Sequence, residues 1–187
     1  MNRFCFQWQI IFYSWLLFTW AYSSNAKERS RITPIHNGIT HIDLNGDTKE
    51  DVIISSYVDI SNSHNSKSYT FFILEHSGKR EIWQRIVWEV KDKLQMDFNT
   101  LEGADCILRD FRLIRFHRRI RPILVMAERE FGQSYADKMP VKFTYFHLFK
   151  NKDHFPGDAY WKYVPQKVIK SKKKYCDVTK SFTELLN

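Results

Sequence analysis

Residues 39–58 read ITHIDLNGDTKEDVIISSYV, and this stretch predicts a β-hairpin. Its two apolar runs, at 39–42 and 52–58, are rich in β-branched side chains, which favour strands. The polar loop between them contains Asn45-Gly46, a pair that supplies the positive φ angle of a tight turn. The stretch therefore indicates an antiparallel β protein.

Similar patterns recur along the rest of the chain. Alternating or short apolar runs predict further strands at 69–74, 82–90, 105–116, 123–128, 141–149 and 160–169. The segment 91–104 is polar and ambiguous, and Asp177 or Thr179 is suited to cap a short helix that runs through Leu186. We expect a mainly β fold, an antiparallel sheet or sandwich-like domain with little helix and a short C-terminal helix; an α+β fold is the alternative.

The composition describes a folded protein with an excess of positive charge. The 187 residues are 43% hydrophobic and 16% aromatic, which excludes disorder because there is ample apolar area to bury. The chain has 29 Lys and Arg residues against 21 Asp and Glu residues. The basic residues are concentrated at 109–121 and 167–174. No nucleic-acid-binding motif accompanies these runs, so we interpret them as solvated faces and expect no nucleic-acid partner. The alternative is that they bind an acidic partner or a phosphate group of the cell envelope.

Residues 1–26 have the pattern of a secretory signal peptide. A basic start precedes a stretch from 4 to 20 without charge, and small residues lead up to Ala26. We therefore expect cleavage after Ala26, export, and a single compact domain at 27–187 with no stable membrane anchor. The alternative is an uncleaved anchor, but two glutamines interrupt the apolar run, and about 20 apolar residues are normally needed to span a bilayer.

The cysteines fit an exported chain. Cys5 lies in the predicted signal peptide, which leaves Cys106 and Cys176 as an even pair in an oxidising compartment. A disulfide between them would close a loop of about 70 residues and stabilise the fold by about 4 kcal/mol in the chain-entropy model. The alternative is two buried free thiols.

The loop of the predicted hairpin has side-chain oxygens at its first, third, fifth and ninth places. They belong to Asp43, Asn45, Asp47 and Asp51, and such a set suits Ca²⁺, which takes six to eight oxygen ligands. The loop is not an EF-hand, because its glycine stands fourth and Ile54 stands twelfth. It resembles the D-x-N-G-D-x-x-x-D turn of integrin-type FG-GAP repeats. The alternative is a hydrogen-bonded turn without an ion.

The sequence contains none of the common motifs of hydrolases. It has no Gly-x-Ser-x-Gly and no His-Glu-x-x-His. A Ser-x-x-Lys match at Ser171 arises from a run of lysines, and the accompanying Ser-Asp-Asn and Lys-Thr-Gly motifs of serine β-lactamases are absent. We therefore assign no catalytic residue and expect a protein that is not an enzyme.

Several short motifs together resemble the carbapenem intrinsic-resistance proteins of the CarF/CarG type. These motifs are NGITHIDLNGD at 37–47, DVII at 51–54, NSHNS at 62–66, YTF at 69–71, GADC at 103–106 and YCD at 175–177. Members of this family are exported and protect the cell without being recognised β-lactamases. The resemblance implies a periplasmic self-resistance role and transfers no catalytic residue to this chain.

These observations lead to one functional hypothesis and two alternatives. We expect a periplasmic protein that gives intrinsic resistance to a carbapenem without hydrolysis. Its partner would be the antibiotic itself, which it sequesters, or the periplasmic proteins of peptidoglycan synthesis, which it shields. The alternatives are an envelope hydrolase whose site assembles only in the fold, and a structural or adhesion module stabilised by Ca²⁺.

Overall fold

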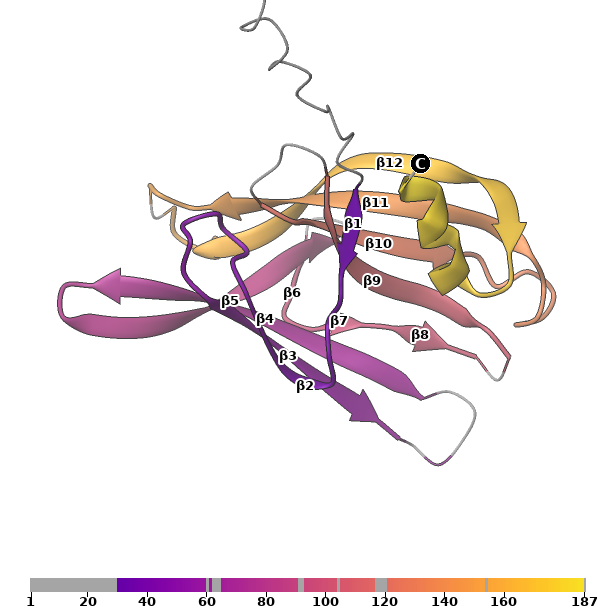
Figure 1. The fold of residues 1–187 in the computed structure, drawn as a ribbon, viewed down its shortest axis with the longest axis horizontal. Helices are drawn as coiled ribbons and strands as arrows, with labels where there is room; N and C mark the ends of the chain where they lie inside the picture. The colour runs from indigo at the N-terminus through magenta and orange to yellow at the C-terminus, as the bar shows by residue number, and fades with distance from the viewer. Residues whose placement is uncertain are drawn as a thin grey trace, which may run out of the picture.

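The computed structural model describes residues 30–59, 61, 65–90, 93–103, 105–116, 121–153 and 155–186, and Figure 1 shows their arrangement. The predicted signal peptide, residues 1–26, lies outside the described residues. The elements are β1 (Arg31–Thr33), β2 (Gly38–Ile42), β3 (Asp51–Val58), β4 (Ser66–Ser77), β5 (Arg80–Val90), β6 (Lys93–Gln95), β7 (Phe98–Asn99), β8 (Leu101–Glu102), β9 (Ile107–Arg115), β10 (Ile123–Arg129), β11 (Met139–Lys150), β12 (Trp161–Tyr175) and the 3₁₀ helix η1 (Val178–Leu185).

All twelve strands belong to a single sheet, whose main path has the order β1-β9-β10-β11-β12-β5-β4-β3-β2. The short strands β6, β7 and β8 pair with β5, β4 and β9. Neighbouring strands are antiparallel, except that β12 and β5 run parallel from Trp161 opposite Ile86 to Tyr163 opposite Trp88. The predicted mainly β fold is confirmed, with one curled mixed sheet in the place of two separate ones.

The sheet curls so strongly that strands far apart in its order face each other across a buried core. Tyr69 on β4 meets Phe111 on β9 edge-on, with ring centroids 6.4 Å apart, and Trp88 on β5 meets the same ring at 5.5 Å. Phe98 on β7 lies among them, stacked on Trp88 at 5.2 Å. Aromatic rings bury large apolar areas and favour such edge-on and offset contacts. The concave face therefore holds the main hydrophobic core.

A short segment of the chain closes one side of this core. β7 pairs with β4, and β8 pairs with β9. Between the two short strands, the N–H of Thr100 donates to the carbonyl of Lys67 at 2.9 Å. Residues 98–102 therefore join β4 to β9, two strands that the sheet order separates, and this explains why the sequence of this segment lacks an ordinary strand pattern.

The convex face carries a second, smaller core beneath η1. Alternate residues of a strand face opposite sides of a sheet, so Leu124 contributes to the concave core and its neighbour Val125 to the convex one. The convex core contains Ile114, Val125, Ala127, Val141, Phe143, Val178 and Phe182. Within the described ranges, no helix is long and apolar enough to cross a membrane.

Most of the predicted elements are present, and some have different bounds. The hairpin is confirmed, because β2 and β3 pair antiparallel with Ile39 opposite Ile54. The predicted cap is confirmed too, because the Asp177 carboxylate accepts a hydrogen bond from the N–H of Thr179 at 2.9 Å. The last strand is longer than predicted. It continues through the lysine-rich stretch to Tyr175, because β11 pairs with it along this whole length.

The predicted disulfide is present between Cys106 and Cys176, whose Cα atoms lie 5.6 Å apart. Cys106 precedes β9 and Cys176 follows β12. The bond therefore ties together two strands that the sheet order separates by β10 and β11.

Candidate functional site

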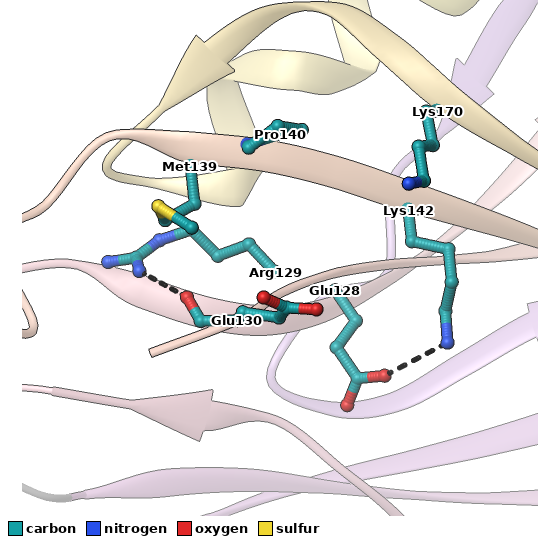
Figure 2. A pocket seen from close by; sticks show the side chains of 7 residues that line it. All are labelled: Glu128, Arg129, Glu130, Met139, Pro140, Lys142 and Lys170. Atoms are coloured by element: carbon teal, nitrogen blue, oxygen red, sulfur yellow. Dashed lines mark hydrogen bonds and ion pairs between the residues drawn. The ribbon is translucent and has the colours of Figure 1, made fainter. Parts of the chain in front are cut away.

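A pocket of about 460 Å³ lies where β10 ends and β11 begins, beside β12 (Figure 2). This volume falls in the range of about 300–1,000 Å³ that is usual for small-molecule sites. The residues that line it are Glu128, Arg129, Glu130, Met139, Pro140, Lys142 and Lys170. They combine cations, carboxylates and two apolar side chains, so the pocket is suited to an amphipathic ligand that carries charge.

Four charged side chains stand in register across the sheet at this pocket. Glu128 on β10 is opposite Arg109 on β9 and opposite Lys142 on β11, and Lys142 is in turn opposite Lys170 on β12. We call these four residues the charge row. It contains three cations and one carboxylate, so it carries an excess of positive charge at the β11–β12 end.

The single carboxylate of the charge row, that of Glu128, accepts its hydrogen bonds from Arg109. The Nε atom of Arg109 donates to Oε1 of Glu128 at 2.8 Å, and its Nη2 atom donates to the same oxygen. Lys142 Nζ reaches Oε2 of Glu128 only at 3.9 Å, as the dashed line in Figure 2 marks. Lys170 makes no ion pair with any residue in the described ranges. The two lysines are therefore the cations that remain available to a ligand.

Arg129 forms a wall of the pocket rather than a contact for a ligand. Its side chain is only 4% exposed, and burial lowers the pKa of its guanidinium. The guanidinium donates to the carbonyls of Cys176 at 2.5 Å, of Glu130 at 2.7 Å and of Tyr135. Because a buried guanidinium needs such acceptors, Arg129 fixes the end of β10 to the disulfide and makes this side of the pocket rigid.

The acidic loop predicted as a metal site lies elsewhere, between β2 and β3. The Asp43 carboxylate accepts hydrogen bonds from the N–H groups of Gly46 at 2.5 Å and Thr48 at 2.9 Å. Asn45 accepts from the N–H of Asp47 at 2.8 Å, and Asp47 accepts from the N–H of Lys49 at 2.9 Å. The side-chain oxygens thus organise the turn itself. Gly46 has the positive φ, 81°, that the sequence predicted.

Asp51, the fourth predicted ligand, is fully buried at the end of this loop. Its carboxylate accepts from the N–H of Leu44 at 2.8 Å and from the N–H of Leu74 on β4 at 3.1 Å. Burial raises the pKa of Asp51 to about 6, although these two hydrogen bonds oppose the rise. Asp51 therefore anchors the loop to β4.

Among the described residues, no group of three His, Cys, Asp or Glu side chains is arranged to hold a metal ion. Calcium binding by Asp43, Asn45, Asp47 and Asp51 stays a prediction. The structure adds one contact that the sequence did not suggest. A Cβ atom placed on Gly46 would lie 2.8 Å from Cγ of Arg121, so this arginine packs directly on the turn.

The basic stretches that we interpreted as solvated faces have several separate uses. Arg109 pairs with Glu128, and Arg112 pairs with Asp110 at 2.7 Å while lying over the ring of Phe182. In the second stretch, Lys170 enters the pocket. Sequence reasoning missed this pocket because Lys142 and Lys170 meet only through the register of β11 on β12. Arg118 and Arg119 lie outside the described residues.

Comparisons with known proteins agree with this structure. A family model described as "Carbapenem resistance protein CarG-like" matches residues 35–184, which include the acidic loop, the pocket and both bonded cysteines. The solved structure titled "Crystal structure of CarG" has a TM-score of 0.69 at 21% sequence identity and covers 82% of this chain and 94% of that chain, so the two folds are alike. No curated protein matches. The chain therefore belongs to the CarG-like family of carbapenem resistance proteins.

Proposed function

We propose that this protein is exported to the periplasm and gives its cell intrinsic resistance to a carbapenem without hydrolysing it. It would act by binding the antibiotic or by shielding the proteins of peptidoglycan synthesis. The observation that carries the proposal is the family match across residues 35–184. The signal-peptide pattern of residues 1–26 supports export.

The chemistry of the pocket favours binding over catalysis. Its seven lining residues include no Ser, Thr, Cys or His, the side chains that most often supply a nucleophile or a general base in acyl transfer. They do include two lysines that remain available, next to the apolar Met139 and Pro140. Such a site can hold an anionic ligand with an apolar body, and a carbapenem is a ligand of this kind.

A resistance assay in a carbapenem-sensitive host tests the proposal. We expect that the full chain raises the inhibitory concentration of a carbapenem at least fourfold, and that a matched chain lacking residues 2–26 does not. An unchanged inhibitory concentration, with the full-length product shown by fractionation to be in the periplasm, would overturn the proposal. Resistance from the leaderless chain would overturn only its periplasmic part.

A second assay separates binding from hydrolysis. Purified protein is incubated with an excess of carbapenem, and the absorbance of the ring system is followed. We expect a loss of at most one equivalent. Continued loss beyond one equivalent, absent from a mock preparation, would identify an enzyme and contradict a non-hydrolytic mechanism. A chain without any resistance phenotype, but stabilised by Ca²⁺, would instead fit a structural or adhesion module.

A further inference from the structure

We infer that Lys142 and Lys170 form an anion subsite that binds the carboxylate of a small organic ligand. The inference deepens the proposed function, on which it rests for the identity of the ligand. Its basis is the charge row on the described strands and the pocket around it.

The first step is the register of the two lysines. They stand directly opposite each other on the antiparallel strands β11 and β12. Like charges in such positions destabilise a sheet, so a folded protein gains by placing an anion between them. The neighbouring Glu128 does not supply this anion fully, because Arg109 holds one of its oxygens through two nitrogens and Lys142 is 3.9 Å from the other.

The second step concerns the kind of anion. Glu128 and Glu130 also line the pocket. Their negative charges would repel a polyanion such as a nucleic acid, which presents many phosphates at once. A single carboxylate can instead lie between Lys142 and Lys170, with Glu128 on the other side of Lys142. Met139 and Pro140 then offer apolar contacts to the body of the same molecule.

The third step is the rigidity of the surroundings. The pocket lies at the end of β10 and on the paired strands β11 and β12, whose register shifts between Pro140 and Lys142. Arg129 and the disulfide fix the end of β10 relative to the end of β12. Rigid surroundings keep the backbone positions of the two lysines fixed before the ligand arrives, so binding orders only their side chains. The flexible lysines need only close on the carboxylate.

Calorimetric titration of the purified chain at low salt tests the subsite with three probes. These are a carbapenem, the methyl ester of its carboxyl group, and acetyl-D-alanyl-D-alanine, a peptide with a free carboxylate. We expect the carbapenem to bind at least tenfold more tightly than its ester, and its affinity to fall as NaCl is raised. The peptide distinguishes the source of the carboxylate. Binding of the peptide alone would support the subsite and contradict sequestration of the drug.

Variants with matched changes of charge locate the subsite. Lys142→Gln/Lys170→Gln is expected to weaken carbapenem binding at least tenfold, whereas Lys170→Arg keeps it within threefold. The control is Lys167→Gln on the same strand. The amine of Lys167 lies over the ring of Tyr145, which packs against the convex core, and its loss should change the affinity less than twofold. Thermal unfolding of each variant verifies that it folds.

The outcomes separate this inference from the proposed function. Equal affinity for acid and ester, equal effects of the double variant and Lys167→Gln, or no binding of any probe would overturn the subsite. If the double variant keeps full resistance in cells, protection does not use the subsite, and the proposed function survives in its shielding form. If the unaltered chain gives no resistance yet binds the acid, the subsite survives and the proposed function fails.

Discussion

The acidic loop and the lysine pair are both clusters of like charge, and the fold treats them in opposite ways. In the loop, each carboxylate accepts hydrogen bonds from nearby backbone N–H groups, such as those of Gly46 and Thr48 on Asp43. At the pair, Lys142 shares a carboxylate with Arg109, and Lys170 has no acidic partner in the described ranges. A charged cluster is thus a better candidate for a ligand site when the fold leaves its charges unsatisfied.

The acidic loop is built mainly from contacts between residues close in the sequence, whereas the pocket depends on residues far apart. Removal of the disulfide, a contact of the second kind, should therefore have the largest effect on stability. Cys106→Ser/Cys176→Ser should lower the free energy of unfolding by about 4 kcal/mol, as expected when the cross-link that closes a loop of about 70 residues is lost. Urea unfolding measures this. The variant should also lower amide-exchange protection more around the pocket than in the acidic loop, because Arg129 in the pocket wall donates a hydrogen bond to the carbonyl of Cys176. Equal loss of amide-exchange protection in both regions would contradict the distinction.

Within the loop, Asp51 should contribute far more than the exposed carboxylates. Asp51→Ala leaves the buried N–H group of Leu44 and the partly buried N–H group of Leu74 without an acceptor. Since each orphaned buried donor costs about 1–3 kcal/mol, we expect a loss of about 3 kcal/mol in urea unfolding at pH 7. Asp47→Ala is the control and should cost less than about 1 kcal/mol, because the carboxylate accepts one exposed and one partly buried hydrogen bond and is itself exposed. Similar losses for both variants would mean that the loop is not anchored through Asp51.

Calcium would change the comparison, because it would make the loop a ligand site as well. If Asp43, Asn45, Asp47 and Asp51 bind Ca²⁺ in the folded state only, the ion raises stability by about 2.7 kcal/mol at a free concentration one hundred times its dissociation constant. Extracytoplasmic sites can have dissociation constants of about 0.1–1 mM, so the titration must extend well above this range. Melting temperatures in chelator and in excess Ca²⁺ measure the effect, which Asp47→Ala should abolish. The same melting temperature in both solutions would show that hydrogen bonds alone hold the turn.

The raised pKa of Asp51 predicts a pH dependence that the lysine pair does not share. Its value in the folded chain is about 6, against 3.8 for an ordinary Asp. Between these values the folded chain holds a proton that the unfolded chain has released, so stability rises as the pH falls from 6 to 4, by about 2 kcal/mol. Urea unfolding across this range, compared between the natural chain and Asp51→Asn, isolates this contribution. Parallel curves would show that Asp51 does not titrate as described.

The smallest effect concerns the lysine pair without a ligand. Lys170→Gln removes a like charge opposite Lys142, so it should raise stability by a few tenths of a kcal/mol at low salt. Lys142→Gln also removes the contact with Glu128 and should give a smaller gain or none. Precise thermal unfolding at two salt concentrations tests this. A loss of stability in Lys170→Gln would mean that the amine already has a favourable partner.

The features that depend on neighbouring residues could be predicted from the sequence. The pairing of strands that lie far apart in the chain could not. The hairpin of β2 and β3 and the cap at Asp177 depend on residues close in the chain, and both are confirmed. The parallel contact of β12 with β5 depends on residues more than seventy positions apart, such as Trp161 and Ile86. No periodicity within either strand reveals such a partner.

The candidate site shows the same limit. The lysine-rich stretch was visible in the sequence, but nothing in it distinguishes Lys170 from Lys167 or Lys173. Only the pairing of β11 with β12 places Lys170 opposite Lys142, while Lys167 stands opposite Tyr145. For the acidic loop, the sequence identified the correct residues and left two uses open. It could not show that Asp51 reaches the N–H of Leu74, twenty-three positions away.

The pairing of the first strand with the middle of the chain has a consequence for folding. β1 lies at one end of the sheet order, and its partner is β9, with Arg31 opposite Arg115. Because the chain is synthesised from its N-terminus, β1 is made long before its partner β9. Folds rich in such distant pairings fold slowly, typically in milliseconds to seconds, and their waiting strands are prone to pair with other chains. We therefore expect this protein to fold slowly, or to need a chaperone that covers its early strands until β1 can pair with β9.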